Sequence, residues 1–251
     1  MAAMVERNST TALIVGASQG IGLEFVRQLL QTHRVDRVYA TYRNSQSELL
    51  VLADPRLHCL PMDITEEGQI ATVVQEIQTQ TAVLHYVINC VGLLHERALQ
   101  PEKSLRQLNA EQLLHYFQVN SIGAVLLAKH VQPLLKHSDR AILATISAKI
   151  GSIGDNYLGG WYGYRASKAA LNMFMRTTAI EYKRTCPRVI VVNLHPGTTD
   201  TRLSRPFQRN VYPEKLFPVN RTVQQLLTVL DQLQESDSGD FFSWDGSRLP
   251  W

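Results

Sequence analysis

The chain has 251 residues, of which 45% are hydrophobic and 19% are charged, a balance that fits one soluble α/β domain with a sizeable core. The formal net charge of +3 is small and the basic residues form no long run, so nucleic acid is not an expected partner. No apolar stretch approaches the ~20 residues needed to span a bilayer, so no membrane association is expected.

Short β-branched runs alternate with helical patterns along the chain. Strands are predicted at residues 11–17, 36–43, 57–64, 84–92, 140–147, 188–197 and 239–246. Helices are predicted at residues 22–33, 66–80, 110–136, 164–183 and 223–234. Nearly continuous apolar strands separated by helices are typical of a parallel sheet covered on both faces. The sequence therefore predicts one α/β domain over residues 1–251, a doubly wound parallel sheet of about seven strands with helices on both faces.

The turn after the first predicted strand reads VGASQGIG and places Gly16, Gly20 and Gly22 at GxxxGxG spacing. Glycines there allow a tight turn and a close backbone approach to a diphosphate, which the N-terminus of the following helix attracts. The same predicted site includes the residues between the glycines, Ser18, Gln19 and Ile21. The alternative is a glycine-rich turn without a ligand. The turn lacks the ending of a P-loop, which argues against nucleotide hydrolysis.

The end of the second predicted strand selects the nucleotide, and Arg43 stands there. A guanidinium pairs bidentately with a 2′-phosphate, so Arg43 favours NADP(H) over NAD(H). A solvated surface arginine is the alternative. After the third strand, the side chain of Asp63 and the backbone of Ile64 are candidates to hold the adenine edge. Asp63 could equally cap the helix that follows.

Tyr164 and Lys168 are spaced i, i+4, so on a helix they lie on one face. Tyr162 has Ala166 at i+4 and therefore no such partner. A neighbouring ammonium is expected to lower the pKa of the Tyr164 phenol from its ordinary value of about 10. A phenol tuned in this way can protonate a carbonyl oxygen as hydride arrives. An ordinary exposed helix pair is the alternative.

Six segments occur in the order and spacing of the short-chain dehydrogenase/reductase family, which the chain resembles over nearly its whole length. They are GASQGIG, NCVG, YFQVNSIGA, TISAKIGS, YRASK and HPGTTDT. The sequence segment GSIGDN…GGWYGYRASKAALN is similar to the corresponding segment in the branch of the family that contains C-factor signalling proteins and sniffer-type carbonyl reductases. The resemblance implies a Rossmann-type fold and a nicotinamide cofactor.

The resemblance also implies a role for each matching residue. Tyr164 would be the acid/base, Lys168 would bind the nicotinamide ribose and lower the tyrosine pKa, and Asn120 would anchor a water in a proton relay. The PGTTDT segment would hold the carboxamide through the backbone of Thr199. The other implied cofactor contacts are Asn89, Val91, Gly92, Pro196, Gly197 and Thr201.

One departure from the family concerns its catalytic serine, usually the second of a Ser-Ser pair after the fifth strand. Here the pair reads Ser147–Ala148. Either the chain shifts by one residue and Ser147 takes the role, or Ser152 substitutes, or the serine function is weakened. Because successive strand residues face opposite ways and a bulge can re-aim a side chain, Ser147 is predicted to be the catalytic serine.

Two segments are expected to border the substrate. Trp161 and Tyr162 either wall the pocket or pack under a loop. Residues 204–218 carry three prolines and are interpreted either as a mobile substrate lid or as a disordered surface loop. Cys90 is interpreted as a small core residue.

Together these inferences predict an NADP(H)-dependent oxidoreductase that reduces a ketone or aldehyde by hydride transfer. The alternative is a signalling or redox-sensing protein that binds NADP(H) with little turnover. It is motivated by the similarity to C-factor sequences and by Ala148. A sugar-nucleotide epimerase is disfavoured because its glycine turn has GxxGxxG spacing.

The expected partner is a small carbonyl or alcohol. Three scattered cysteines and an N-terminus without an apolar core indicate a reduced, cytoplasmic setting. No metal is expected, because the histidines and cysteines form no ligand-like cluster. The apolar run at residues 124–135 would permit a homodimer or homotetramer, although core packing explains it as well.

Overall fold

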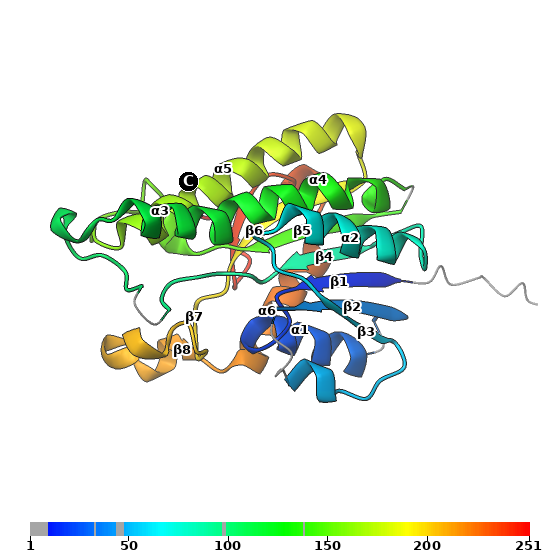
Figure 1. Cartoon of the computed structure of the whole chain (residues 1–251), viewed down its shortest axis with the longest axis horizontal. Coiled ribbons are helices and arrows are strands. Elements are labelled where there is room, and N and C mark those ends of the chain that lie inside the picture. The colour runs from blue at the N-terminus through cyan, green and yellow to red at the C-terminus, as the bar shows by residue number, and fades with distance from the viewer. Residues whose placement is uncertain (1–9, 33, 44–47, 97–98, 138) are drawn as a thin grey trace, which may run out of the picture.

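The computed structural model describes residues 10–32, 34–43, 48–96, 99–137 and 139–251 (Figure 1). Seven parallel strands form the central sheet, in the order β3-β2-β1-β4-β5-β6-β9. Their bounds are β1 (Thr11–Val15), β2 (Arg37–Tyr42), β3 (Leu57–Pro61), β4 (Tyr86–Asn89), β5 (Ala141–Ile146), β6 (Val189–His195) and β9 (Phe241–Ser243). The strand order reverses between β1 and β4, so the carboxyl ends of these two strands mark a topological switch point.

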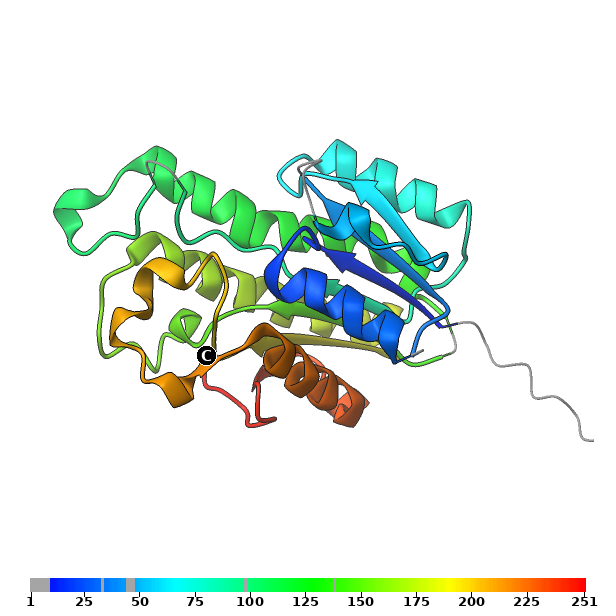
Figure 2. The same cartoon turned by 90° about the horizontal axis from the view of Figure 1, so that it is seen from below.

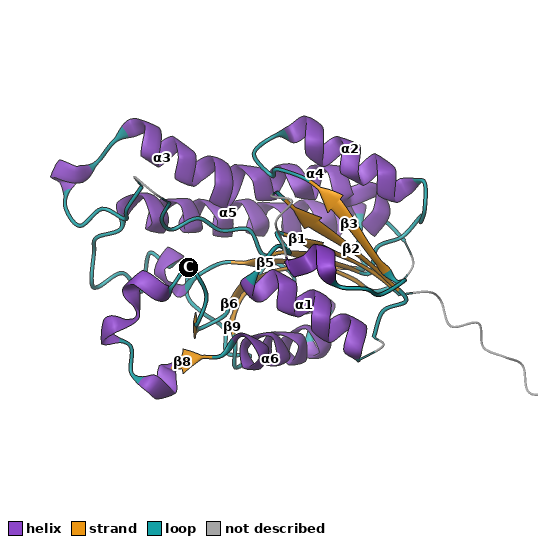
Figure 3. Cartoon of the chain, turned by 60° about the horizontal axis from the view of Figure 1, so that its bottom comes forward, coloured by secondary structure: helices purple, strands orange, loops and turns teal. Residues whose placement is uncertain are grey.

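Helices cover both faces of this sheet (Figures 1 and 2). One face carries α1 (Gly20–Gln31) and α6 (Val219–Gln232), and the other carries α2 (Glu67–Gln78), α4 (Gly123–Leu135) and α5 (Tyr162–Thr185). Figure 3 shows the strands enclosed between these two layers. The predicted doubly wound sheet of about seven strands is therefore confirmed.

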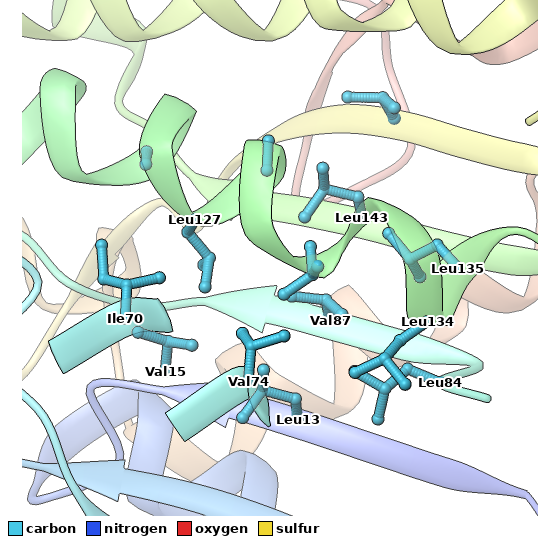
Figure 4. Packing of buried hydrophobic residues seen from close by; sticks show 14 of the residues in the cluster. Leu13, Val15, Ile70, Val74, Leu84, Val87, Leu127, Leu134, Leu135 and Leu143 are labelled. Atoms are coloured by element: carbon cyan, nitrogen blue, oxygen red, sulfur yellow. The ribbon is translucent and has the colours of Figure 1, made fainter. Parts of the chain in front are cut away.

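The sheet is buried on both sides, which is why its strands are nearly continuously apolar. In β1, Leu13 and Val15 pack under α2 and α4, whereas Ala12 and Ile14 pack against α1 and α6. Figure 4 shows the hydrophobic cluster on the side of α2 and α4, where side chains of these helices contact those of the strands. Each large apolar side chain buried in this way contributes about 1.5–3 kcal/mol to folding.

The helix predicted over residues 110–136 is interrupted. It consists of α3 (Ala110–Phe117), a π-helical turn (Gln118–Ile122) and α4. Such π turns often occur at functional sites, and this one contains Asn120. The helix predicted from Tyr164 begins two residues earlier, at Tyr162. The predicted last residue of the first helix, His33, and residues 1–9 lie outside the described residues.

A second, two-stranded sheet was not predicted. It pairs β7 (Thr198–Thr199) with β8 (Leu216–Phe217) and lies beyond the carboxyl end of β6. Between these strands, residues 205–210 and 213–215 form short 3-10 helices, so the described segment is folded rather than a disordered loop. Within the described ranges, no helix is long and apolar enough to cross a membrane.

Candidate active site

A cavity of about 630 Å³ opens at the carboxyl ends of the central strands, where doubly wound sheets bind their ligands. It gathers most of the residues predicted to bind the cofactor: Gly16, Ser18, Gln19, Gly20, Ile21, Gly22, Arg43, Asp63, Ile64, Val91, Gly92, Pro196, Gly197, Thr199 and Thr201. Three of the predicted catalytic residues, Ser147, Tyr164 and Lys168, also line it. Asn89 and Asn120 are not among the lining residues.

The glycine turn needs its glycines for two different reasons. Gly16 and Gly20 have φ values of +78° and +55°, a conformation that side chains disfavour. At Gly22 an added Cβ would lie 2.3 Å from the carbonyl oxygen of Gly16, so only glycine fits. The helix α1 starts here, and its N-cap residue Gln19 makes no side-chain cap. The first N–H groups of α1 are thus left for an anion in the cavity.

Arg43 follows β2 at the cavity edge, with 53% of its side chain exposed. Its guanidinium lies 3.4 Å from Glu96 and 3.9 Å from Asp63. Asp63 does not cap α2, whose N-cap is Glu66; its Oδ1 instead accepts hydrogen bonds from the backbone and hydroxyl of Thr65. Sequence reasoning missed Glu96, because only the fold brings this loop residue to Arg43.

Tyr164 and Lys168 lie on the buried side of α5, and Tyr164 is 7% exposed. The Lys168 Nζ donates a hydrogen bond to the Ile146 carbonyl oxygen at 2.9 Å and lies 6.0 Å from the centre of the Tyr164 ring. Burial lowers the pKa of Lys168 to about 8 and raises the pKa of Tyr164 above its ordinary value. The expected lowering of the Tyr164 pKa is therefore not found in this structure, because burial disfavours the charged phenolate.

Asn120, in the π turn, forms hydrogen bonds to the segment after β4 and to α5. Its Oδ1 accepts from the Leu93 N–H at 2.7 Å, and its Nδ2 donates to the Leu93 carbonyl and to the Ser167 hydroxyl. These bonds connect the segment after β4 with α5. The Asn89 side chain similarly accepts from the Val91 N–H and shapes the turn after β4.

The predicted catalytic serine has a partner elsewhere. The Ser147 hydroxyl donates to Asn172 Oδ1 on α5 at 2.7 Å. Ala148 packs against the apolar cluster that contains Tyr164. Ser152 does not line the cavity, and its hydroxyl accepts from the Asp155 N–H. The assignment of Ser147 stays a prediction, and its bond to Asn172 weighs against it.

Aromatic side chains border the cavity beside Tyr164. Trp161 lines it, with its ring 4.9 Å from Phe207 and 6.3 Å from Tyr164 between centroids. Tyr162 is 37% exposed and borders a separate shallow hollow instead. Of the two wall candidates, Trp161 is thus placed at the cavity and Tyr162 is not. The segment predicted as a lid contributes Ser204, Phe207 and Val211.

His195, at the end of β6, also lines the cavity. Its Nδ1 lies 3.2 Å from the Lys149 N–H and accepts that hydrogen bond. Burial, with a smaller effect of Lys149, lowers the pKa of His195 to about 4. The imidazole is therefore neutral near pH 7. The sequence motif contains His195, but nothing in the sequence indicated its burial.

Comparisons with known proteins agree with this architecture. Residues 10–211 match the short chain dehydrogenase family. An NADPH-bound carbonyl reductase from chicken fatty liver is 28% identical, with a TM-score of 0.86 over 97% of this chain and 95% of that one. The carbonyl reductase Sniffer of D. melanogaster is 27% identical, with a TM-score of 0.86 over 97% of this chain and 100% of that one.

A curated relative, the C-signal protein of Myxococcus xanthus, is 29% identical over 148 residues, which are 59% of this chain and 84% of that protein. These likenesses place the chain among oxidoreductases built on a doubly wound sheet. The chain belongs to the short-chain dehydrogenase family, and the resemblance inferred from its motifs is confirmed.

Proposed function

We propose that the protein is an NADP(H)-dependent carbonyl reductase that converts a ketone or aldehyde to an alcohol. One observation carries the proposal: a single cavity holds the glycine turn, the Arg43 guanidinium and the buried Tyr164–Lys168 pair. The likeness to carbonyl reductases, one of them with NADPH bound, supports the same choice of cofactor and reaction.

The residues present fit such a cofactor. The uncapped N-terminus of α1 and the space kept by Gly22 would receive a diphosphate. Arg43 would exchange its two carboxylate neighbours for the 2′-phosphate, a doubly charged and bidentate partner. Val91 and Gly92 would line a ribose, and the turn with Thr199 would hold the carboxamide.

The bound cofactor would supply the hydride, and the chain would supply the proton. Because burial raises the pKa of Tyr164, its phenol stays protonated at neutral pH and can donate to the carbonyl oxygen during reduction. The Lys168 ammonium, held by the Ile146 carbonyl, would stabilise the phenolate that forms. The apolar side chains packed around Tyr164 would limit the access of water during this transfer.

Tyr164→Phe is the test, with NADPH oxidation followed across a panel of ketones and aldehydes. We expect kcat to fall by about 10²–10⁴-fold, since the variant lacks the proton donor. The NADPH dissociation constant should stay within about twofold. Tyr162→Phe, which changes a phenol outside the cavity, is the matched control and should behave as wild type. Tight NADPH binding without reduction of any carbonyl would refute the proposal.

A second candidate function is NADP(H) sensing with little turnover. It is favoured by the alanine that packs beside Tyr164 and by the bond that occupies the Ser147 hydroxyl. The likeness to the C-signal protein points the same way. Under this function, NADPH would bind and protect the fold while no carbonyl is reduced, so the same panel distinguishes the two candidates.

A further inference from the structure

The three residues before α5, the helix that carries Tyr164, have an unusual left-handed backbone conformation. Gly159, Gly160 and Trp161 have φ values of +63°, +65° and +52°. Trp161 is the one non-glycine residue with a positive φ in the described part of the chain. A left-handed backbone crowds Cβ against the next carbonyl oxygen, so a tryptophan keeps this conformation only where its surroundings enforce it.

Glu102 holds this turn through both its backbone and its side chain. Its carbonyl oxygen accepts from the Trp161 N–H at 2.5 Å, and its Oε2 accepts from the Gly163 N–H at 3.1 Å. The residue is only 2% exposed. A buried carboxylate, 61 positions earlier in the chain, thus caps the first turn of α5. Its negative charge also suits the positive end of the helix dipole.

The fit around this cap is close. A Cβ added at Gly163 would lie 2.4 Å from the Tyr116 ring and 2.9 Å from Glu102 Oε1. That Oε1 is buried and makes no hydrogen bond to the described residues. The Tyr116 hydroxyl is engaged elsewhere, donating to the Leu94 carbonyl at 2.6 Å. The carboxylate is therefore held by packing on one side and by the helix N–H on the other.

We propose that Glu102 is a positioning residue for the reaction, acting through the left-handed turn on Trp161 and Tyr164. Tyr164 is the third residue of α5, next to the capped Gly163. The Trp161 ring contacts both Tyr164 and Phe207 edge-on, so the turn also sets the wall of the cavity. The kinetic part of this proposal rests on the proposed carbonyl reductase function.

Three variants test the kinetic part. Glu102→Ala should lower kcat by about tenfold to a hundredfold, the cost of a misplaced catalytic group. The NADPH dissociation constant should stay within about twofold, since the cofactor residues lie on other elements. Glu102→Gln keeps an oxygen for the Gly163 N–H and should stay within about threefold of wild-type kcat. Glu111→Ala removes an exposed acid in the first turn of α3 and should change nothing.

Amide hydrogen exchange provides a readout independent of turnover. In Glu102→Ala, residues 159–166 should exchange at least about tenfold faster than in the wild type, while residues 175–185 of the same helix keep their rate. Exchange could be faster in Glu102→Ala while the wild-type protein reduces no carbonyl. That result would refute the reductase function but would still support the anchoring of the turn by Glu102. Unchanged exchange, or unchanged kcat in a protein that reduces carbonyls, would overturn the positioning role.

If Glu102→Ala does not fold, Glu102→Asp takes its place. Aspartate keeps the charge but withdraws the carboxylate from Gly163 by one methylene. We expect kcat to fall by about fivefold or more and exchange at residues 159–166 to increase. A wild-type kcat and a wild-type exchange rate in Glu102→Asp would overturn the proposal.

Discussion

Lys168 has a pKa of about 8, which brings its titration into the working range of an enzyme. Because burial lowers this pKa, the ammonium loses its proton as the pH rises through about 8, while the Tyr164 phenol remains protonated. We expect kcat for reduction to be level between pH 6 and 8 and to fall above about 8, as the charge that stabilises the phenolate is lost. Titration of His195 should not change kcat in this pH range, since its pKa is about 4.

A pH–rate profile of carbonyl reduction measures this directly. Lys168→Arg should move the fall to higher pH, because a guanidinium keeps its charge. A rate that rises from pH 8 to 10 would contradict the assigned role of the lysine.

Ala148 gives a second prediction for a single residue. It packs in the cluster that contains Tyr164, so a hydroxyl at this position would lie on the phenol side of the cavity. Ala148→Ser should raise kcat by about tenfold through one added hydrogen bond to the carbonyl oxygen. Ser147→Ala should instead reduce the free energy of unfolding by about 1 kcal/mol, as its bond to Asn172 is lost.

Steady-state kinetics and urea unfolding of the two variants separate these effects. A Ser147→Ala protein that keeps its stability but loses turnover would show that Ser147 is the catalytic serine after all.

The turn between β1 and α1 allows a sharp prediction at the level of an element. In Gly22→Ala the new Cβ would meet the backbone of Gly16 and Ala17 at 2.3–3.0 Å, and backbone atoms cannot move aside. We expect a loss of about 1–3 kcal/mol in the free energy of unfolding. NADPH binding should weaken by at least about tenfold, since we propose that the same turn receives the diphosphate.

Gly68→Ala in α2 is the matched control, because nothing lies within 4 Å of its added Cβ. It should leave NADPH binding unchanged and stabilise the helix by about 0.5–1 kcal/mol. Urea unfolding and NADPH titration check both variants. Equal stability of the two would contradict the steric argument.

The sequence predicted those elements whose signal is local. Each of these signals lies within a short window of about 15 residues or fewer. Examples are the apolar run of β1 with the glycines after it, and the helical spacing of Tyr164 and Lys168. The π turn at Asn120 was missed because helical periodicity continues through it. The β7–β8 pair was missed because two-residue strands leave no pattern.

The site residues that were missed depend on the fold as a whole. Glu102 looks like any surface acid in the sequence, and only the structure shows it buried against α5. The direction of the Tyr164 pKa depends on desolvation, which the spacing of two residues does not encode. The partner of the Ser147 hydroxyl is likewise set by how α5 packs on β5.

At the scale of the whole molecule, cofactor binding should stabilise the fold. NADPH at about 100 times its dissociation constant adds about 2.7 kcal/mol, which corresponds to an increase of roughly 5–10 °C in Tm for a domain of this size. NADH at the same concentration should raise Tm less, because it has no 2′-phosphate for Arg43. In Arg43→Ala the two nucleotides should raise Tm equally.

Thermal unfolding with each nucleotide is the measurement. Arg34→Ala, which removes an exposed arginine paired with Asp231 away from the cavity, is the control and should keep the preference for NADPH. A wild type that is stabilised equally by NADH and NADPH would contradict the role given to Arg43.

Assembly into a homodimer or homotetramer stays a prediction. The apolar run of α4 is explained by the core, since Leu127, Val131 and Leu134 are buried within the chain. Met173 and Ile180 of α5 are exposed, and we expect a second copy to cover them if the chain assembles.

The short β7–β8 sheet has a consequence for how the protein can diversify. The pairing of Thr199 with Phe217, and the hydrogen bond from the Asp200 N–H to the Phe217 carbonyl, close the neck of the loop between them. These are backbone bonds, so they do not require particular side chains in the loop. We therefore expect that this loop can change in sequence or length while the half of the cavity beside the glycine turn keeps its shape.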